Sequence, residues 1–324
     1  MKKIVSFIPI IALVLFFFSG CDKYDEIYSP KCMISKVWYR SNVDTNVNFP
    51  EGIYTAPASE TYNYNGEDQI TSISLISGRG YAFTYDDDGR ITTITYVNKY
   101  GLTENITYTY EGEKKKKFMV GLEYMIDGTV RQTVSFTRRA DKTVASIDIQ
   151  YDREFFKSLD EISKSEFYEQ FVGYNDNAIT AMQQSDSKEL TRKSFTQVFY
   201  DEKTMNIIKS VTTIPESNYV ETTLFEYDDK MNPFFEMPFS YCANYNGDNI
   251  VNTRSSNYNF LIGFSENNKT MENTDIKFFG NSHDYTSIHY IYEYNEKDYP
   301  RRITERSSKY NNIPNSIFIL YVNE

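Results

Sequence analysis

The chain has 324 residues and a formal net charge of −11, from 45 acidic and 34 basic residues. This acidic balance argues against a nucleic-acid partner, which needs a basic face, and against a protein that lies flat on anionic lipid. Aromatic residues make up 16% of the chain, with 29 Tyr and one Trp. The tyrosines follow the period of β-strands, so we favour strand packing over a carbohydrate platform as the reason for their abundance.

Residues 1–20 have the pattern of an export signal. Lys2 and Lys3 form a basic start, and the apolar core Ile4–Phe18 is shorter than the roughly 20 residues of a membrane-spanning helix. The following Phe18-Ser19-Gly20-Cys21 resembles the lipobox of bacterial lipoproteins, in which the cysteine thiol receives a diacylglycerol before cleavage. We therefore predict lipid attachment at Cys21; the alternatives are an ordinary signal peptide and an uncleaved anchor.

Residues 21–30 form a polar tether that contains Asp22, Asp25 and Glu26. In Bacteroidetes lipoproteins, an acidic run directly after the lipidated cysteine resembles the signal for export to the cell surface. This resemblance implies a protein that is anchored in the outer membrane by its lipid and faces the cell surface. A periplasm-facing orientation remains the alternative.

Residues 31–324 are predicted to form a single large domain built on the unit Tyr81–Tyr96. Tyr81, Phe83 and Tyr85 share one face of a strand, Asp86–Gly89 provides turn residues, and a second strand returns toward Tyr96. In the return strand, Ile91 and Ile94 lie three residues apart. This spacing predicts either a strand buried on both sides or a β-bulge between them.

The unit recurs along the chain, so we predict a chain of β-hairpins. The further copies begin in Tyr62–Gly66, Tyr108–Gly112, Phe136–Asp141, Phe171–Asn177, Phe199–Asp201, Phe225–Asp228 and Tyr292–Asn295. Hairpins joined by short connections form an antiparallel meander. The predicted fold is all-β: a large curved sheet or part-closed barrel that is porin-like in shape and water-soluble.

The segment Phe83–Ile91 resembles the YD repeat of RHS-type proteins. The whole chain resembles a group of Bacteroidetes lipoproteins of unknown function with a porin-like β fold. That resemblance is carried by the lipid-attachment signal, Lys31–Ile34, Tyr227–Phe234 and Tyr294–Pro300. It implies an architecture and no catalytic residues.

Other segments extend this prediction. Trp38 is expected in the first strand, around Met33–Tyr39, and the apolar Ser316–Val322 is expected to be a central strand that closes the sheet. One short helix, about Arg153–Ser163, is predicted between hairpins because its apolar residues line one face. The lysine run Lys114–Lys117 is expected at a solvated hairpin end.

Few residues have a pattern that points to chemistry. Cys32 and Cys242 are expected to be small buried residues, with a disulfide as the alternative. His283 and His289 have no cysteine or acid at metal-ligand spacing, so we expect them to face solvent. For Asp86–Gly89 we favour a plain turn over a Ca²⁺ site.

We predict no catalytic residues, no cofactor and no metal, since the sequence lacks a Gly-x-Ser-x-Gly elbow, a P-loop, a Rossmann fingerprint and an HExxH motif. The leading functional hypothesis is a non-enzymatic, lipid-anchored scaffold that binds a glycan or a protein. The alternative is a periplasm-facing carrier of a lipid or apolar ligand, and the third is an envelope glycan hydrolase.

Overall fold

The computed structural model describes residues 33–41, 52–97, 101–112, 118–152, 191–214, 218–235, 265–277, 283–308 and 314–322. In these ranges the chain is almost entirely β-strand. One 3₁₀ turn, η1 (Ile53–Thr55), precedes the second strand. The described residues contain no helix that is both long and apolar enough to cross a membrane.

Sixteen strands form a single sheet. They are β1 (Ile34–Ser41), β2 (Glu60–Tyr64), β3 (Ile70–Leu75), β4 (Gly80–Tyr85), β5 (Ile91–Val97), β6 (Thr103–Glu111), β7 (Phe118–Ile126), β8 (Thr129–Arg138), β9 (Val144–Tyr151), β10 (Thr191–Tyr200), β11 (Ile207–Ile214), β12 (Tyr219–Met231), β13 (Asn267–Lys277), β14 (His283–Tyr294), β15 (Pro300–Ser307) and β16 (Asn315–Tyr321).

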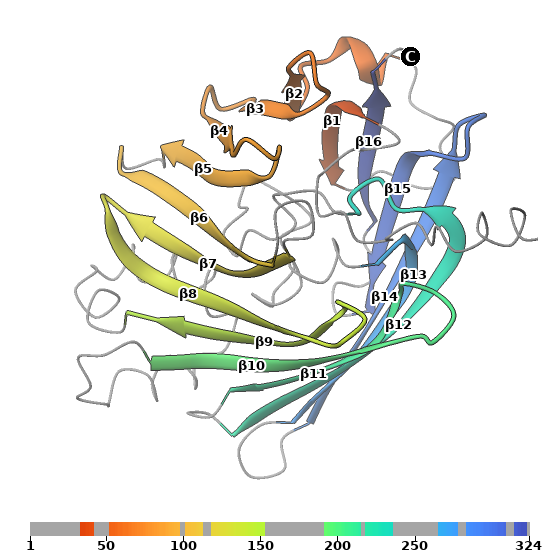
Figure 1. The fold of residues 1–324 in the computed structure, drawn as a ribbon. Coiled ribbons are helices and arrows are strands. Elements are labelled where there is room, and N and C mark those ends of the chain that lie inside the picture. Colours follow the sequence, from red (N-terminus) through yellow and green to blue (C-terminus); the bar gives the residue numbers. More distant parts are fainter. Residues whose placement is uncertain are drawn as a thin grey trace, which may run out of the picture.

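Each strand pairs antiparallel with its sequence neighbours, and β16 pairs with β1, so the sheet closes into a barrel (Figure 1). The predicted antiparallel meander is therefore confirmed, and the ring is complete. The predicted strand Ser316–Val322 corresponds to β16, which has β15 on one side and β1 on the other. Its apolar sequence fits this place because a central strand exposes neither edge.

A β-bulge explains the spacing of Ile91 and Ile94. In the hairpin of β4 and β5, Thr84 pairs with Thr93 but Tyr85 pairs with Ile91, so one residue of β5 is unpaired. Ile91 and Ile94 are consequently buried on the same side. The register shifts in the same way in six other pairs of consecutive strands, after Asn63, Thr109, Thr137, Phe199, Glu226 and Glu293, and β12 has a further shift between Tyr227 and Met231.

The two ends of the chain build an eighth copy of this unit. Tyr321 of β16 pairs with Ile34 of β1, and a register shift follows, as it does between Tyr85 and Ile91. The Val322 amide also donates a hydrogen bond to the Met33 carbonyl oxygen at 2.8 Å. The barrel is thus a ring of eight two-strand units, and the last unit is divided between the first and last strands.

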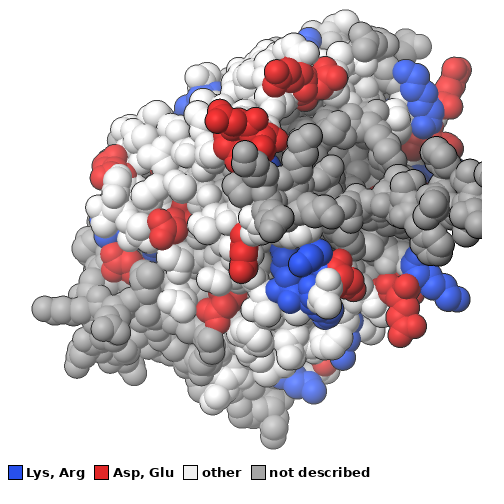
Figure 2. Space-filling model, in the orientation of Figure 1, with Lys and Arg blue, Asp and Glu red and all other residues white. Residues whose placement is uncertain are grey.

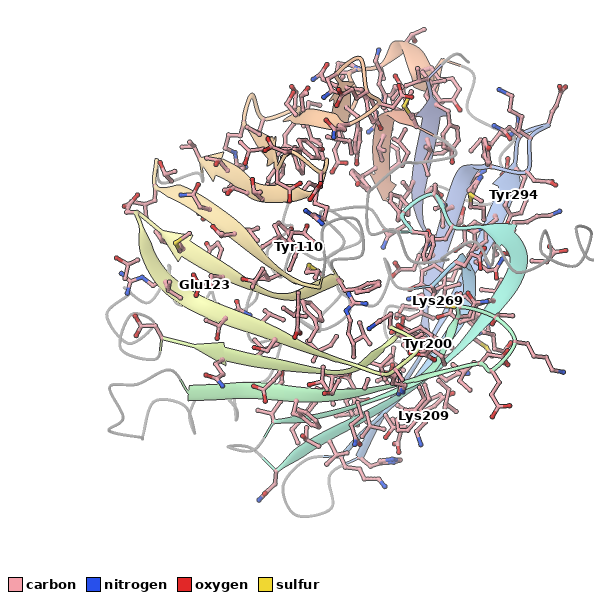
Figure 3. All side chains as sticks on the ribbon, viewed as in Figure 1. Tyr110, Glu123, Tyr200, Lys209, Lys269 and Tyr294 are labelled. Atoms are coloured by element: carbon pink, nitrogen blue, oxygen red, sulfur yellow. The ribbon has the colours of Figure 1, made fainter. Side chains whose placement is uncertain are left out.

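The hydrophobic core follows the inner side of the ring. Buried residues from β1 to β16 form one continuous cluster, and Figure 3 shows Tyr110 and Tyr200 on the inner side and Lys209 on the outer side. A second, smaller cluster covers the outer side of the β1–β16 seam. There Trp38 and Phe318 are fully buried against Ile53 of η1, and the Trp38 indole nitrogen donates to the Ala56 carbonyl at 2.9 Å.

Several predictions fall outside the described residues. These are the signal 1–20 with Cys21, the tether 21–30, Cys32, Cys242, the lysine run 114–117, the helix 153–163 and the repeat copy 171–177. They stay predictions.

Candidate functional site

The register shifts of the seven repeat units lie toward one end of the barrel, which we call the YD-turn end. At this end, the residue of the returning strand at each register shift offers its backbone carbonyl to a side chain, which in seven of eight cases comes from the next unit. At Val144 the donor is Arg139 of the same hairpin, whose other terminal nitrogen donates to the Val198 carbonyl on β10 of the next unit. The eight donor–acceptor pairs are Tyr64 OH to Ile34 O (2.8 Å), Tyr85 OH to Ile70 O (2.6 Å), Tyr110 OH to Ile91 O (2.8 Å), Arg138 Nε to Met119 O (2.9 Å), Arg139 Nη1 to Val144 O (2.8 Å), Tyr227 OH to Ile207 O (2.7 Å), Tyr292 OH to Lys269 O (2.7 Å) and Tyr321 OH to Pro300 O (2.8 Å). We call this set the carbonyl ring.

The carbonyl ring explains why tyrosine recurs in the repeat. A bulge leaves a backbone carbonyl without its ladder partner, and a buried acceptor without a donor is costly. A tyrosine on the adjacent strand of the next unit fills the apolar space and places its hydroxyl on that oxygen. Each unit is therefore joined to the previous one by a side chain as well as by the sheet, and the Tyr321 and Tyr64 bonds carry this linkage across the chain ends.

The acid that follows the tyrosine folds the turn. Asp86 Oδ1 accepts from the Asp88 and Arg90 amides at 3.0 and 2.9 Å, and Asp86 Oδ2 accepts from Arg90 Nη2 at 2.6 Å. These bonds to Arg90 lower the pKa of Asp86 against the opposing effect of its burial. Asn65, Asp201 and Asn295 accept backbone amides in the same manner.

The same turn was weighed as a Ca²⁺ site. In the structure, the Arg90 guanidinium pairs with both Asp86 and Asp88, each at 2.6 Å, and Arg90 is 3% exposed. A buried cation therefore already occupies the position between the two carboxylates and balances one of their two negative charges. This arrangement is that of the plain turn we favoured.

The inner side of the barrel differs in polarity between its two halves. From β3 to β9 it is apolar, with buried residues such as Ile73, Phe83, Leu122 and Ile147. From β10 to β13 the inner side still has the buried apolar residues Val198, Ile207, Ile214 and Phe225, but buried hydroxyl and carboxyl side chains lie among them. We call this set the inner polar wall: Thr196, Ser210, Thr212, Glu221, Thr223, Glu272 and Thr274.

Hydrogen bonds across neighbouring strands satisfy part of the inner polar wall. The Oγ1 atoms of Thr196 and Thr212 are 2.9 Å apart, and those of Thr223 and Thr274 are 3.2 Å apart. Because hydroxyls act as donor and acceptor, such pairs lower the cost of burying them.

Two carboxylates in this wall have different environments. Glu272 Oε2 lies 2.6 Å from Lys269 Nζ, and the ammonium also lies 4.8 Å from the centre of the Tyr290 ring. Burial lowers the pKa of Lys269, and the Glu272 charge opposes this shift. Figure 3 shows Lys269 on the inner side of the ring.

Glu221 has no cation of this kind in its described surroundings. It accepts a hydrogen bond from the Tyr219 hydroxyl and is 8% exposed. Burial raises the pKa of Glu221 to about 7, and the charge of Glu272 adds to the rise while the Tyr219 bond opposes it. Glu221 therefore changes its charge near neutral pH.

The outer side of β10–β14 holds most of the large hydrophobic side chains that are exposed in the described part of the chain. Five of the eight exposed large hydrophobic residues lie on these strands: Phe199, Ile208, Leu224, Tyr285 and Ile291. On most other strands the exposed outward residues are small or polar, such as Thr84, Thr109 and Ser135. In the view of Figure 2, charged side chains form small, separate groups on the described surface.

The two histidines lie on the outer side of β14, as predicted. His289 and His283 are exposed, and His283 Nε2 contacts Asp275 Oδ1 on β13. Ser287, between them, contacts His289 Nε2 at 3.3 Å. No group of three or more potential metal ligands occurs in the described part of the chain.

Sequence reasoning missed the inner polar wall and the exposed apolar residues behind it. The segment Tyr219–Phe225 reads YVETTLF, in which the β-prone Tyr, Val, Thr and Phe favour a strand but the polar Glu221, Thr222 and Thr223 follow one another without alternation. The pattern does not reveal which set faces inward, because the two sides are distinguished only by the closed sheet.

Comparison with known proteins supports the repeat. Residues 64–99 match the family model of the RHS Repeat. No curated protein matches the chain.

Solved structures with a similar fold include a porin-like protein from Bacteroides uniformis, with 10% identity and a TM-score of 0.46, covering 89% of this chain and 96% of that one. A porin-like protein from Bacteroides vulgatus has 14% identity and a TM-score of 0.36, with 79% and 100% covered. The TcdB2-TccC3 structure has 10% identity and a TM-score of 0.21, with 79% and 12% covered. All three TM-scores are below 0.5, so they carry nothing about function. The chain is thus a closed β-barrel that contains an RHS repeat, with a likeness to porin-like proteins of Bacteroides.

Proposed function

We propose that this protein is an outer-membrane lipoprotein, anchored through Cys21, whose barrel is a non-enzymatic scaffold that binds a glycan or a protein. The observation that carries this proposal is the outer surface of the barrel. Its exposed strand residues are threonines, serines, amides and charged groups interrupted by a few apolar side chains. A surface of this kind suits recognition in water, whereas a barrel in lipid needs a continuous apolar band.

The carbonyl ring suits a scaffold. Each unit is fixed to its neighbour by a hydrogen bond in addition to the strand ladder, so outward side chains hold their relative positions. Ordered surface groups lose less conformational entropy when a partner binds.

The position of β1 determines which end of the barrel the proposed lipid anchor would hold. Ile34, where β1 begins, accepts the Tyr64 bond at the YD-turn end. A lipid on Cys21 would therefore tether the barrel by this end, through a segment that spans at most about 40 Å when extended. Surfaces near the opposite end would then lie farther from the membrane and be accessible to partners.

The inner polar wall disfavours the carrier of an apolar ligand. An apolar molecule against Glu221, Glu272 and Lys269 would desolvate these groups without offering them hydrogen bonds. Native mass spectrometry of the purified protein separates the two functions, because a co-purifying lipid supports the carrier.

Three experiments test the three parts of the proposal, namely the anchor, the surface display and the binding function. Mass spectrometry of the mature protein should find a lipid on Cys21. The variant Cys21→Ala should leave the membrane fraction, and its retention there contradicts the lipid anchor. Protease treatment of intact cells tests surface display. Glycan-array and pull-down profiling of the mature protein should identify a ligand, whereas a reproducible hydrolytic activity without any ligand overturns the scaffold.

A further inference from the structure

We infer that the outer side of β12–β14 binds a carbohydrate, with the Tyr285 ring as a stacking surface. This inference rests on the scaffold function proposed above and assigns its ligand class and site. It begins from the outer side of β10–β14, where exposed apolar side chains occupy outward positions that most other strands give to threonine and serine. Exposed apolar groups concentrated on one part of a surface mark an interaction site.

Tyr285 is held in a fixed position although it is 57% exposed. It pairs with Asp275 across the β13–β14 ladder, and its hydroxyl donates to Asn273 Oδ1, two residues along β13, at 2.8 Å. The ring is therefore tied at both ends, to its own strand and to the neighbouring one. A ring held in this way lies across the sheet and offers one face to solvent.

The groups beside this ring are polar. Asn273 Oδ1 accepts from both the Tyr285 and Ser287 hydroxyls, each at 2.8 Å, so its amide nitrogen is directed away from these bonds. No described residue accepts a hydrogen bond from that nitrogen. Asp275 is the residue that pairs with Tyr285 in the β13–β14 ladder. His283, at the start of β14, contacts Asp275 on the same outer surface.

This combination distinguishes a carbohydrate from a protein partner. A sugar ring has an apolar face of C–H groups, which packs on an aromatic ring, and hydroxyls at its rim, which need both donors and acceptors. The Asn273 amide donates, the Asp275 carboxylate accepts, and both lie next to Tyr285. A protein hot spot instead has apolar neighbours that exclude water from the contact.

Leu224 extends the surface away from Tyr285. It is 51% exposed and pairs with Asn273 across the β12–β13 ladder. Two strand spacings, or about 10 Å, separate β12 from β14. A chain of sugars crossing the strands would thus contact Tyr285 first and Leu224 next, with Asn273 between them.

Binding of defined oligosaccharides tests this site. The mature protein in detergent would be immobilised and titrated with maltohexaose, cellohexaose, mannohexaose and xylohexaose. We expect at least one to bind. Tyr285→Ala should raise its Kd at least about tenfold, because the stacking face is lost. Tyr285→Phe should keep the Kd within about threefold, because the ring remains.

The control is Ile76→Ala. Ile76 is 59% exposed and directly follows β3, which lies far from β12–β14 in the ring. This substitution should leave the Kd unchanged. The emission of Trp38, the single tryptophan, verifies that each variant is folded. Equal binding by Tyr285→Ala and the parent protein overturns the inference, and so does the failure of all four sugars to bind. If pull-down finds a protein partner that Tyr285→Ala still binds, the carbohydrate site is wrong while the scaffold function stands.

Discussion

Tyr85→Phe isolates one bond of the carbonyl ring. The substitution removes a hydroxyl and leaves the aromatic ring in place, so the Ile70 carbonyl loses a donor that lies at 2.6 Å. A typical intramolecular hydrogen bond contributes about 1 kcal/mol, and an unpaired acceptor in a partly buried site adds to the loss. We therefore expect Tyr85→Phe to lower the free energy of unfolding by about 1 to 2 kcal/mol.

Urea unfolding, followed by far-UV circular dichroism, measures this loss as a lower midpoint. Tyr285→Phe is the matched control, because it removes the same atom from an exposed bond to Asn273 and should change stability by less than about 0.5 kcal/mol. Tyr321→Phe, whose hydroxyl is 2.8 Å from the Pro300 carbonyl in a buried site, should behave like Tyr85→Phe. If all three variants have the same midpoint as the parent protein, the carbonyl ring does not stabilise the barrel.

Two further predictions concern the barrel wall. The pKa of Glu221 is raised from 4.5 to about 7 in the folded state. Between pH 4.5 and pH 7 the folded protein therefore binds more protons than the unfolded chain. Its free energy of unfolding consequently falls as the pH rises through this range. Glu221→Gln stays neutral, so it should gain stability relative to the parent protein between pH 5 and pH 8, by up to roughly 3 kcal/mol. A stability difference between the two proteins that does not change with pH contradicts the raised pKa of Glu221. Gly80→Ala should destabilise the protein by about 2 kcal/mol or more in thermal unfolding, because the new Cβ would lie 2.6 Å from the Ile73 carbonyl oxygen. Gly66→Ala, where nothing lies within 4 Å, is its control, and equal losses in the two variants would show that the close contact is unimportant.

Local pattern was enough to predict the repeated hairpin. The spacing of Tyr81, Phe83 and Tyr85 predicted one buried face, and the three-residue spacing of Ile91 and Ile94 predicted either a bulge or burial on both sides. The structure has the bulge. These features depend on residues close in sequence, for which strand period and turn chemistry are reliable guides.

The sequence predicted that Ser316–Val322 closes the sheet, but it did not identify the strand with which this segment pairs. The pairing of Ile34 with Tyr321 joins opposite ends of the described chain, and nothing in either segment specifies the other. The apolar Ser316–Val322 predicted a central strand, but the outer cover of Phe318 comes from Ile53 near the start of the chain. Such contacts depend on the closed ring as a whole.

The polarity of the inner wall was hidden for a different reason. In β11, Ser210 and Thr212 are buried while Ile208 is 42% exposed, which inverts the usual relation of polarity to burial. Ile207 and Ile214 at the two ends of β11 are buried in the core, so apolar pattern alone does not reveal that Ser210 and Thr212 share their inner side. Buried hydroxyl pairs such as Thr196 with Thr212 make the inverted arrangement possible.

A circular permutant tests most directly whether the chain ends form an eighth unit. A copy of the Asp86–Arg90 turn would join Tyr321 to Ile34, and the chain would be opened at the Asp127–Gly128 turn on the opposite end of the barrel. Because the joined strands have the register of β4 and β5, we predict a folded monomer in which Trp38 keeps the emission maximum of the parent protein. An unfolded chain, or a folded one whose Trp38 emission shifts to that of a solvent-exposed indole, would contradict the eight-unit ring.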